Sequence, residues 1–351
     1  MDFRFTEEQQ MTAEVVHTLL ADTCQPADLR RLMASGAGRD KDRWAKITEM
    51  GLAGALVPEE TGGLGLQAAD FVLAAEACGY AGLPEPLVEH VGTALPLLAD
   101  LAPEAPELAR ALEGKITVAV GHPANLFVAD ADSAGALVLE HDGAVCLVDP
   151  AKARLTRQDS IDPFRRLFTV NFDPAEARLL ATAEIAAPAL AATLDRGALF
   201  TAAQLVGIAQ RCVDLAVAYA RERQQFGKPI GVNQAIKHHL ATAQVKIEFA
   251  RPVVHAGAAM LAQGDLYSRA RISQARLAAA EAADLAARTA IQVHGAMGYS
   301  WEVDVHFFLK RALALTTWWG TPALHRARVA DRVLNGRLGP DQTFAKETTH
   351  G

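Results

Sequence analysis

The residues of this sequence that could bind a phosphorylated ligand gather around Arg223, in the run RERQQFGKPI. A guanidinium presents a planar fork of donors that matches a pyrophosphate, a geometry that lysine does not supply. Gln225 and Gln234 add neutral donors, and Phe226 adds an apolar face. The run therefore predicts contacts to a pyrophosphate-bearing ligand. The competing interpretation is that Arg221 and Arg223 only place positive charge at the end of a helix.

A second run, QVHGAMGY, begins at Gln292 and pairs a polar side chain with two glycines. Gly295 and Gly298 lack β-carbons, so their backbone could approach a nucleotide closely. A glycine helix cap before Tyr299 is the competing interpretation, and both can hold together. His294 has no evident metal partner, so we interpret it as a packed or hydrogen-bonded residue.

Composition and charge exclude several classes of protein. The chain has 351 residues, half of them hydrophobic, which is enough for a large core and two or three domains. The net charge is -7 and the pI is about 5.9, which disfavours a nucleic-acid partner. The polar start MDFRFTEEQQ lacks the apolar core of a secretory signal, and no run of about 18 apolar residues predicts a membrane span. We expect a cytoplasmic protein.

The cysteines carry no recognisable motif. They lie far apart, without CxxC or His pairing, which fits neither a zinc site nor a disulfide framework. We therefore interpret all of them as ordinary buried thiols: Cys24, Cys78, Cys146 and Cys212.

Three kinds of segment must position these residues. From Phe5 to about Leu112, apolar residues recur at helical spacing, with breaks at residues 58–65 and 82–84 and at Pro103 and Pro106, which predicts a helical bundle. From about 186 to 338 the chain is again helical and rich in Ala and Leu. Long helices are predicted over 194–221, 234–263 and 266–293, each about 40 Å at 1.5 Å per residue, and they should form a four-helix bundle.

Between these helical parts, short β-rich runs predict a small antiparallel barrel or sheet. The stretch His141-Asp142-Gly143 gives the best hairpin turn, because Asp-Gly adopts the positive φ angles of a two-residue loop. The predicted strands cover residues 116–120, 126–128, 136–139, 144–148 and 167–172.

A helical bundle, a small β domain and a second helical bundle form the arrangement of acyl-CoA dehydrogenases, and the local sequences resemble that family. MDFRFTEEQQ, WAKITEMGLAGALVPEETGGLGL, RERQQFGKPI and QVHGAMGY carry the resemblance, which spans nearly the whole chain. It implies a mainly α fold with a small β domain. The expected parts are an N-terminal helical domain over 1–113, a shortened middle β domain over 114–180 and a C-terminal four-helix bundle over 181–345.

The resemblance also implies FAD as cofactor. In the family the matching Arg and Phe reach FAD held by the neighbouring subunit. Family members usually have two adjacent glycines in the second run, whereas here Ala296 follows Gly295, and its methyl group would tighten or shift the contact. The expected cofactor-binding residues are Arg223, Gln225, Phe226, Gln234, Gln292, Gly295 and Ala296.

The catalytic base of the family has no counterpart. In that family a Glu precedes a Gly-Thr pair and removes the α-proton of an acyl-CoA thioester, but Trp318 and Trp319 precede Gly320 here, and no acid lies between 311 and 321. An indole only donates a hydrogen bond. The family's second location for the base matches Gly197, and Ala198 follows where a substrate-contacting Arg is usual. We therefore expect no catalytic residue in this chain.

Other parts of the family pattern are also missing. Residues 118–126 replace a Thr-Glu-Pro-like turn and a Gly-Ser-like loop, and no Trp-Ile-Thr strand follows, so the β domain is expected to be shortened. Glu248, Glu302 and Asp304 could replace the base, but their positions are typical of a helix surface or a cap.

The preferred hypothesis is a non-base-supplying subunit of a heteromeric, FAD-dependent acyl-CoA dehydrogenase that introduces an α,β double bond. The chain resembles the glutamate-less subunit of such enzymes from bacterial steroid degradation. That resemblance implies a catalytic partner chain in a heterotetramer of two plus two chains, a steroid side-chain CoA thioester as substrate, and electron-transfer flavoprotein as acceptor. The alternatives are a homomeric enzyme with a relocated base and a non-catalytic scaffold subunit.

Overall fold

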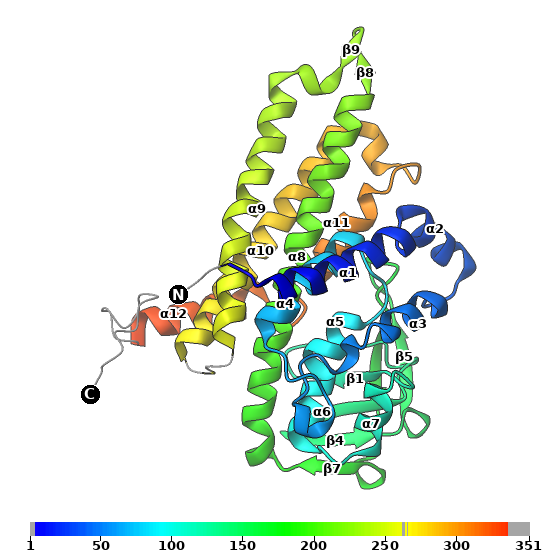
Figure 1. The fold of residues 1–351 in the computed structure, drawn as a ribbon, viewed down its shortest axis with the longest axis vertical. Coiled ribbons are helices and arrows are strands. Elements are labelled where there is room, and N and C mark those ends of the chain that lie inside the picture. The colour runs from blue at the N-terminus through cyan, green and yellow to red at the C-terminus, as the bar shows by residue number, and fades with distance from the viewer. Residues whose placement is uncertain (1–3, 262–263, 265, 336–351) are drawn as a thin grey trace.

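The computed structural model describes residues 4–261, 264 and 266–335, and over these ranges the chain is helical, then β, then helical again (Figure 1). This is the mainly α fold with a small β part that the sequence predicts. The proposed domain limit after residue 113 falls just beyond a helix, and the limit after residue 180 falls inside a strand. The predicted end of the C-terminal bundle at residue 345 lies outside the described residues.

Local caps set the ends of the N-terminal helices. α1 (Glu7–Thr23) begins with a capping box, in which the Thr6 hydroxyl accepts from the Gln9 backbone and the Gln9 side chain accepts from the Thr6 backbone. α4 (Ala68–Ala81) ends at Gly82, whose φ of 68° suits glycine. The other elements are α2 (Pro26–Ser35), α3 (Lys41–Glu49), η1 (Leu52–Gly54), η2 (Glu59–Thr61), α5 (Leu87–Glu89), the π-helical η3 (His90–Ala94), α6 (Leu95–Leu101) and α7 (Pro106–Leu112).

Two glycines bring α4 against α8 (Ala183–Glu222). A β-carbon on Gly79 would lie 2.0 Å from the carbonyl oxygen of Gln204, and one on Gly207 would lie 2.0 Å from that of Glu76. Any larger residue would force the two backbones apart. The N-terminal helices are therefore packed directly onto the C-terminal bundle.

The β part consists of two small sheets. The sequence predicted a fully antiparallel arrangement, and this was wrong for one pair of strands. In the four-stranded sheet, β1 (Val118–Gly121) pairs in parallel with β3 (Ala136–His141), followed by β4 (Ala144–Val148) and β7 (Arg178–Ala181). The chain between β1 and β3 is long enough to leave the sheet and return in the same direction. The three-stranded sheet contains β2 (Val128–Ala129), β6 (Leu167–Asn171) and β5 (Arg154–Gln158).

The predicted hairpin is confirmed. Asp142 and Gly143 have φ angles of 50° and 82°, and they join β3 to β4 in the expected register. β5 and β7 were not predicted, because both carry arginines at exposed positions and lack a buried apolar run. Short 3-10 turns, η4 (Pro150–Lys152) and η5 (Pro174–Glu176), precede them.

The C-terminal bundle contains the three long helices predicted by the sequence. α8 begins at Ala183, 11 residues before the expected start at 194. The sequence did not predict these first turns because they are largely exposed and show no apolar stripe. A short hairpin, β8 (Gln224–Gln225) and β9 (Lys228–Pro229), leads through η6 (Ile230–Val232) to the next helix. The remaining elements are α9 (Gln234–Met260), α10 (Leu266–His294), η8 (Gly295–Tyr299), α11 (Val305–Leu315) and α12 (Pro322–Asn335).

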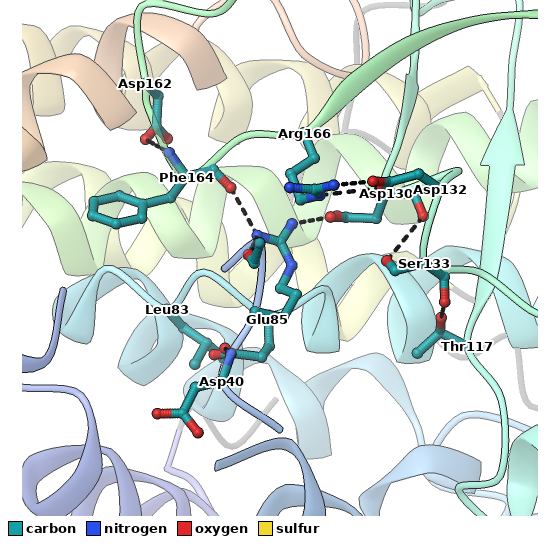
Figure 2. Close-up of polar contacts among 12 residues, drawn as sticks. Asp40, Leu83, Glu85, Thr117, Asp130, Asp132, Ser133, Asp162, Phe164 and Arg166 are labelled. Carbon is teal, nitrogen blue, oxygen red and sulfur yellow. Dashed lines mark hydrogen bonds and ion pairs between the residues drawn. The ribbon is translucent and has the colours of Figure 1, made fainter. Parts of the chain in front are cut away.

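Ion pairs hold the N-terminal part together and connect it to the β part. Glu85 accepts two hydrogen bonds from the fully buried Arg43, at 2.7 and 2.9 Å, within the N-terminal part. Arg39 reaches from the N-terminal part to Asp130 and to the Phe164 carbonyl oxygen in the β part. Figure 2 shows the Arg166 guanidinium directed toward the Asp132 carboxylate, with which it pairs, beside Asp130.

The interpretation of the cysteines is confirmed, since all four are buried free thiols. Burial raises the pKa of the Cys24 and Cys212 thiols to about 12. Within the described ranges, no helix is long and apolar enough to cross a membrane.

Candidate functional site

The two positions where a base was expected face each other. A β-carbon on Gly197, in α8, would lie 2.1 Å from Cδ2 of the Trp319 indole. Trp319 is 1% exposed. Its ring therefore fills the space above Gly197, and no side chain larger than hydrogen fits there.

Trp319 is held by its backbone as well as by its ring. Its N–H donates to Oδ1 of Asn125 at 2.7 Å, and its carbonyl oxygen accepts from Nε2 of His325 at 3.0 Å. Burial, and then the charge of Arg276, lower the pKa of His325 to about 4, so the ring is neutral and donates through Nε2. Trp319 has a φ of 54°, an uncommon conformation for a bulky residue, which these contacts maintain.

Glu89 is the carboxylate at this position, and sequence reasoning missed it. Its Oε1 accepts from the Trp318 indole at 2.6 Å and its Oε2 accepts from the Trp319 indole at 2.7 Å. Burial raises the pKa of Glu89, although Arg165 and the two indoles oppose the shift. A lone acid inside the apolar helical run PLVEHVG was the available signal.

The surroundings of Glu89 leave no room for a substrate. Two cavities border Glu89. The one lined also by Trp318 and β1 measures about 10 Å³, roughly the space for a single water, and the one lined also by Arg165 measures about 40 Å³. The Arg165 guanidinium lies 4.1 Å from the centre of the Trp318 ring, and burial lowers its pKa to about 10. His122 contacts the Trp319 ring from the β part, with centroids 5.3 Å apart. The indoles and their neighbours thus fill this region.

The three acids considered as replacements lie elsewhere. Glu248 pairs with Arg251 on the surface of α9, and Asp304 at the start of α11 pairs with Arg30. Glu302 is exposed. Their positions are the helix surface and cap sites that the sequence predicts.

The expected cofactor-binding residues lie at one end of the bundle, where α8 and α10 end and α9 begins (Figure 1). Arg223 follows the last residue of α8, and its N–H donates to the Tyr219 carbonyl oxygen at 2.8 Å. Phe226 is 98% exposed, with a φ of 53° at the tip of the β8–β9 hairpin. Gln225 lies on β8, and Gln234 begins α9.

The second run lies beside the last turn of α8, because the Tyr219 and His294 rings stack with centroids 4.2 Å apart. Gly295 follows α10 with a φ of 58°, so it has the conformation of a glycine cap. Gly298 is required by packing, since its β-carbon would lie 2.7 Å from the Ile291 carbonyl oxygen. The remaining members of this run, Gln292 and Ala296, are exposed.

The exposed end of the bundle carries polar side chains whose donors are not used inside the chain. Within residues 4–261, 264 and 266–335, the side chains of Arg223, Gln225 and Gln292 are exposed and have no hydrogen-bond partner. They offer charged and neutral donors, and Arg223 and Gln225 belong to the same hairpin segment as the exposed Phe226 ring. In the same ranges, no group of three or more His, Cys, Asp or Glu side chains is arranged to hold a metal ion.

Comparisons with known proteins agree over nearly the whole chain. Residues 6–105 match the family model "Acyl-CoA dehydrogenase, N-terminal domain", and residues 188–334 match "Acyl-CoA dehydrogenase, C-terminal domain". The chain is 36% identical over 319 residues to acyl-CoA dehydrogenase IpdE2 of Mycobacterium tuberculosis, covering 87% of this chain and 91% of that relative.

Solved structures share the fold. The ChsE4-ChsE5 complex from Mycobacterium tuberculosis matches with a TM-score of 0.83 and 23% identity, over 96% of this chain and 100% of the matched chain. The Tcur3481-Tcur3483 steroid ACAD, as its G363A variant, matches with a TM-score of 0.80 and 21% identity, over 94% and 98% of the two chains.

Proposed function

The chain belongs to the acyl-CoA dehydrogenase family, and from that premise we propose that it is the subunit of a heteromeric enzyme that does not supply the catalytic base. The enzyme would introduce an α,β double bond into an acyl-CoA. The observation that carries this proposal is the contact between Trp319 and Gly197, which fills both positions of the family's base with one indole ring.

The chemistry explains why that contact matters. Removing a proton α to a thioester requires a base within hydrogen-bond reach, and FAD, when bound, accepts the hydride. Neither Gly197 nor an indole can accept the proton. Glu89 is not available for this either, because both of its oxygens accept from indoles and the two cavities beside it measure only about 10 and 40 Å³.

The other half of the proposal concerns FAD. Arg223, Gln225, Phe226 and Gln292 would hold the ADP half of a FAD whose flavin lies in the partner subunit. Their exposed and unpartnered donors, around a hairpin tip with an exposed Phe, fit a pyrophosphate and its nucleoside better than they fit internal packing. The set would be completed by Gln234, Gly295 and Ala296.

The relatives support the heteromeric assignment and a substrate class. One structural neighbour is a two-protein complex, and another is a steroid acyl-CoA dehydrogenase named for two chains. We propose a catalytic partner that supplies the glutamate, in an assembly of two plus two chains. The proposed substrate is a steroid side-chain CoA thioester, and the proposed acceptor is electron-transfer flavoprotein.

A homomeric enzyme with a relocated base is the second candidate, and Glu89 is the observation that favours it. Its carboxyl lies at the base position and has a raised pKa, as a general base often does. It could act only if both indoles moved away. A scaffold subunit would bind the partner and leave its flavin affinity unchanged.

Purification alone and with a partner separates these candidates. Expressed alone with FAD, the chain should show no acyl-CoA-dependent dye reduction. Co-expression with acyl-CoA dehydrogenases encoded beside it should give an active complex in which the partner's glutamate contributes roughly 10² to 10⁴-fold in rate. Turnover by the homomer that is lost in Glu89→Gln would establish the relocated base instead. If the partner bound FAD with the same affinity with and without this chain, the chain would be a non-catalytic scaffold subunit.

A further inference from the structure

Two rings connect the ends of α8 and α10. Tyr219, in the last turn of α8, stacks on His294, the last residue of α10, with ring centroids 4.2 Å apart and an interplanar angle of 24°. His294 is 7% exposed. The two helices carry Arg223 and Gln292, so the stack lies between the two runs that the proposed cofactor site combines.

The His294 ring has a fixed orientation. Its Nδ1 lies 2.7 Å from the Ala290 carbonyl oxygen, and because a carbonyl only accepts, Nδ1 carries the proton. Burial lowers the pKa of His294, which keeps the ring neutral near pH 7. A neutral ring held flat against Tyr219 is a rigid contact, not a mobile surface side chain.

The stack is also connected to the backbone of Arg223. The Tyr219 carbonyl oxygen accepts from the Arg223 N–H, and the Arg223 carbonyl oxygen accepts from the Ile230 N–H, both at 2.8 Å. Arg223 is therefore fixed between the stacked turn of α8 and the far end of the hairpin. On the other side of the stack, Gly295 begins the loop after α10 with a φ of 58°.

We propose that Tyr219 and His294 are positioning residues that hold Arg223 and Gln292 at the fixed separation needed to grip one ligand, the ADP half of FAD. This inference rests on the cofactor role proposed above. Neither ring needs to touch the ligand. Each acts through the helix end that it fixes.

The first experiment is amide hydrogen exchange on the full chain. Tyr219→Leu keeps apolar volume but removes the flat ring, so exchange at residues 223–230 and 295–299 should accelerate while α9 stays protected. Tyr219→Phe keeps the ring and should exchange like the wild type. Equal exchange of Tyr219→Leu and wild type in both segments would overturn the inference.

The second experiment measures FAD affinity in the complex obtained by co-expression with the partner. Tyr219→Leu and His294→Leu should each weaken FAD binding about two- to tenfold, the range expected for one aromatic contact, while Tyr219→Phe restores it. In an Arg223→Ala background, Tyr219→Leu should weaken FAD binding less than it does in the wild type, because part of its effect acts through Arg223.

The two possible failures are distinguishable. Unchanged FAD affinity in Arg223→Ala would withdraw the cofactor role of this chain. A loss in Arg223→Ala without any loss in Tyr219→Leu would leave that role intact and overturn the positioning inference alone. Additive losses in the double variant would assign Tyr219 to general packing and overturn the inference as well.

Discussion

At the scale of single residues, Trp319 takes part in contacts that a missing base alone would not require. Its ring lies on Gly197, its indole N–H donates to Glu89, and its backbone bonds to Asn125 and His325. Trp319 therefore fills the space above Gly197, and it also joins Asn125 of the β part to His325 of the C-terminal bundle.

Trp319→Ala should lower the free energy of unfolding by about 3 to 5 kcal/mol, because it opens a cavity and leaves one oxygen of Glu89 without a donor. The free energy of unfolding of Trp319→Gly should lie within roughly 1 kcal/mol of that of Trp319→Ala. Glycine tolerates the φ of 54°, but it also increases the entropy of the unfolded chain. Urea unfolding measures both. Phe226→Ala, at a side chain 98% exposed, is the control and should stay within about 0.5 kcal/mol of wild type. An equal effect of the two alanine variants would contradict the packing role.

Arg223 is the residue on which the cofactor proposal depends. Charge-assisted hydrogen bonds contribute roughly 1.5 to 3 kcal/mol, so Arg223→Ala should weaken FAD retention in the complex about ten- to a hundredfold. Arg223→Lys should restore only part, because an ammonium lacks the planar fork. Arg221→Ala removes the same charge two residues earlier, inside the last turn of α8, and should leave flavin content near normal. If both alanine variants retained FAD with wild-type affinity, Arg223 would be only a positive charge at the end of a helix.

At the scale of elements, the loop between β5 and β6 connects all three parts of the chain. Asp162 pairs with Arg311 of α11 and accepts from the Phe164 N–H. The Phe164 carbonyl oxygen accepts from Arg39, and Arg165 lies over Trp318. Figure 2 shows Asp162 and Phe164 at one end of this network.

Asp162→Asn should lower the free energy of unfolding by about 3 to 5 kcal/mol, because Asp162 is 0% exposed and its loss leaves Arg311 as a buried, unpaired charge. Urea unfolding followed by far-UV circular dichroism measures the loss. The matched control is Asp284→Asn, which breaks an exposed pair with Arg288 on one helix and should cost less than about 1 kcal/mol. Similar losses in the free energy of unfolding for the two variants would contradict the connecting role of this loop.

At the scale of the whole molecule, three buried histidines predict sensitivity to acid. Burial lowers the pKa of His90, His306 and His325 to about 4 each, against an ordinary value of 6.5. Below pH 6.5 the unfolded chain binds protons that the native chain does not, so stability is lost as the pH falls toward 4. Each histidine adds a slope of about 1.4 kcal/mol per pH unit in that window. Glu89 acts in the opposite direction, because burial raises its pKa and the native chain then binds a proton that the unfolded chain does not.

Unfolding in urea at several values between pH 7 and pH 4.5 measures this slope. His306→Phe should reduce the slope by about 1.4 kcal/mol per pH unit, because it removes one group that takes up a proton on unfolding. Within the described residues, neither nitrogen of that buried ring has a hydrogen-bond partner. The same change should leave stability at pH 7 unchanged or higher. His238→Gln, on the exposed face of α9, should keep the full slope. A slope near zero in the wild-type chain would show that these rings are protonated in the native state.

Local patterns in the sequence predicted the helical and β parts and the Asp142-Gly143 hairpin, because periodicity and turn chemistry act over short stretches of chain. The resemblance to the family identified Gly197 and Trp319 as the positions where a base is absent. Only the tertiary structure revealed the parallel pairing of β1 with β3, the contact of Trp319 with Gly197, and Glu89 beneath both indoles. These features join residues between 18 and 230 positions apart. Spacing along the chain carries no signal for such pairs, since their distance depends on how α5, α8 and the loop after α11 pack together.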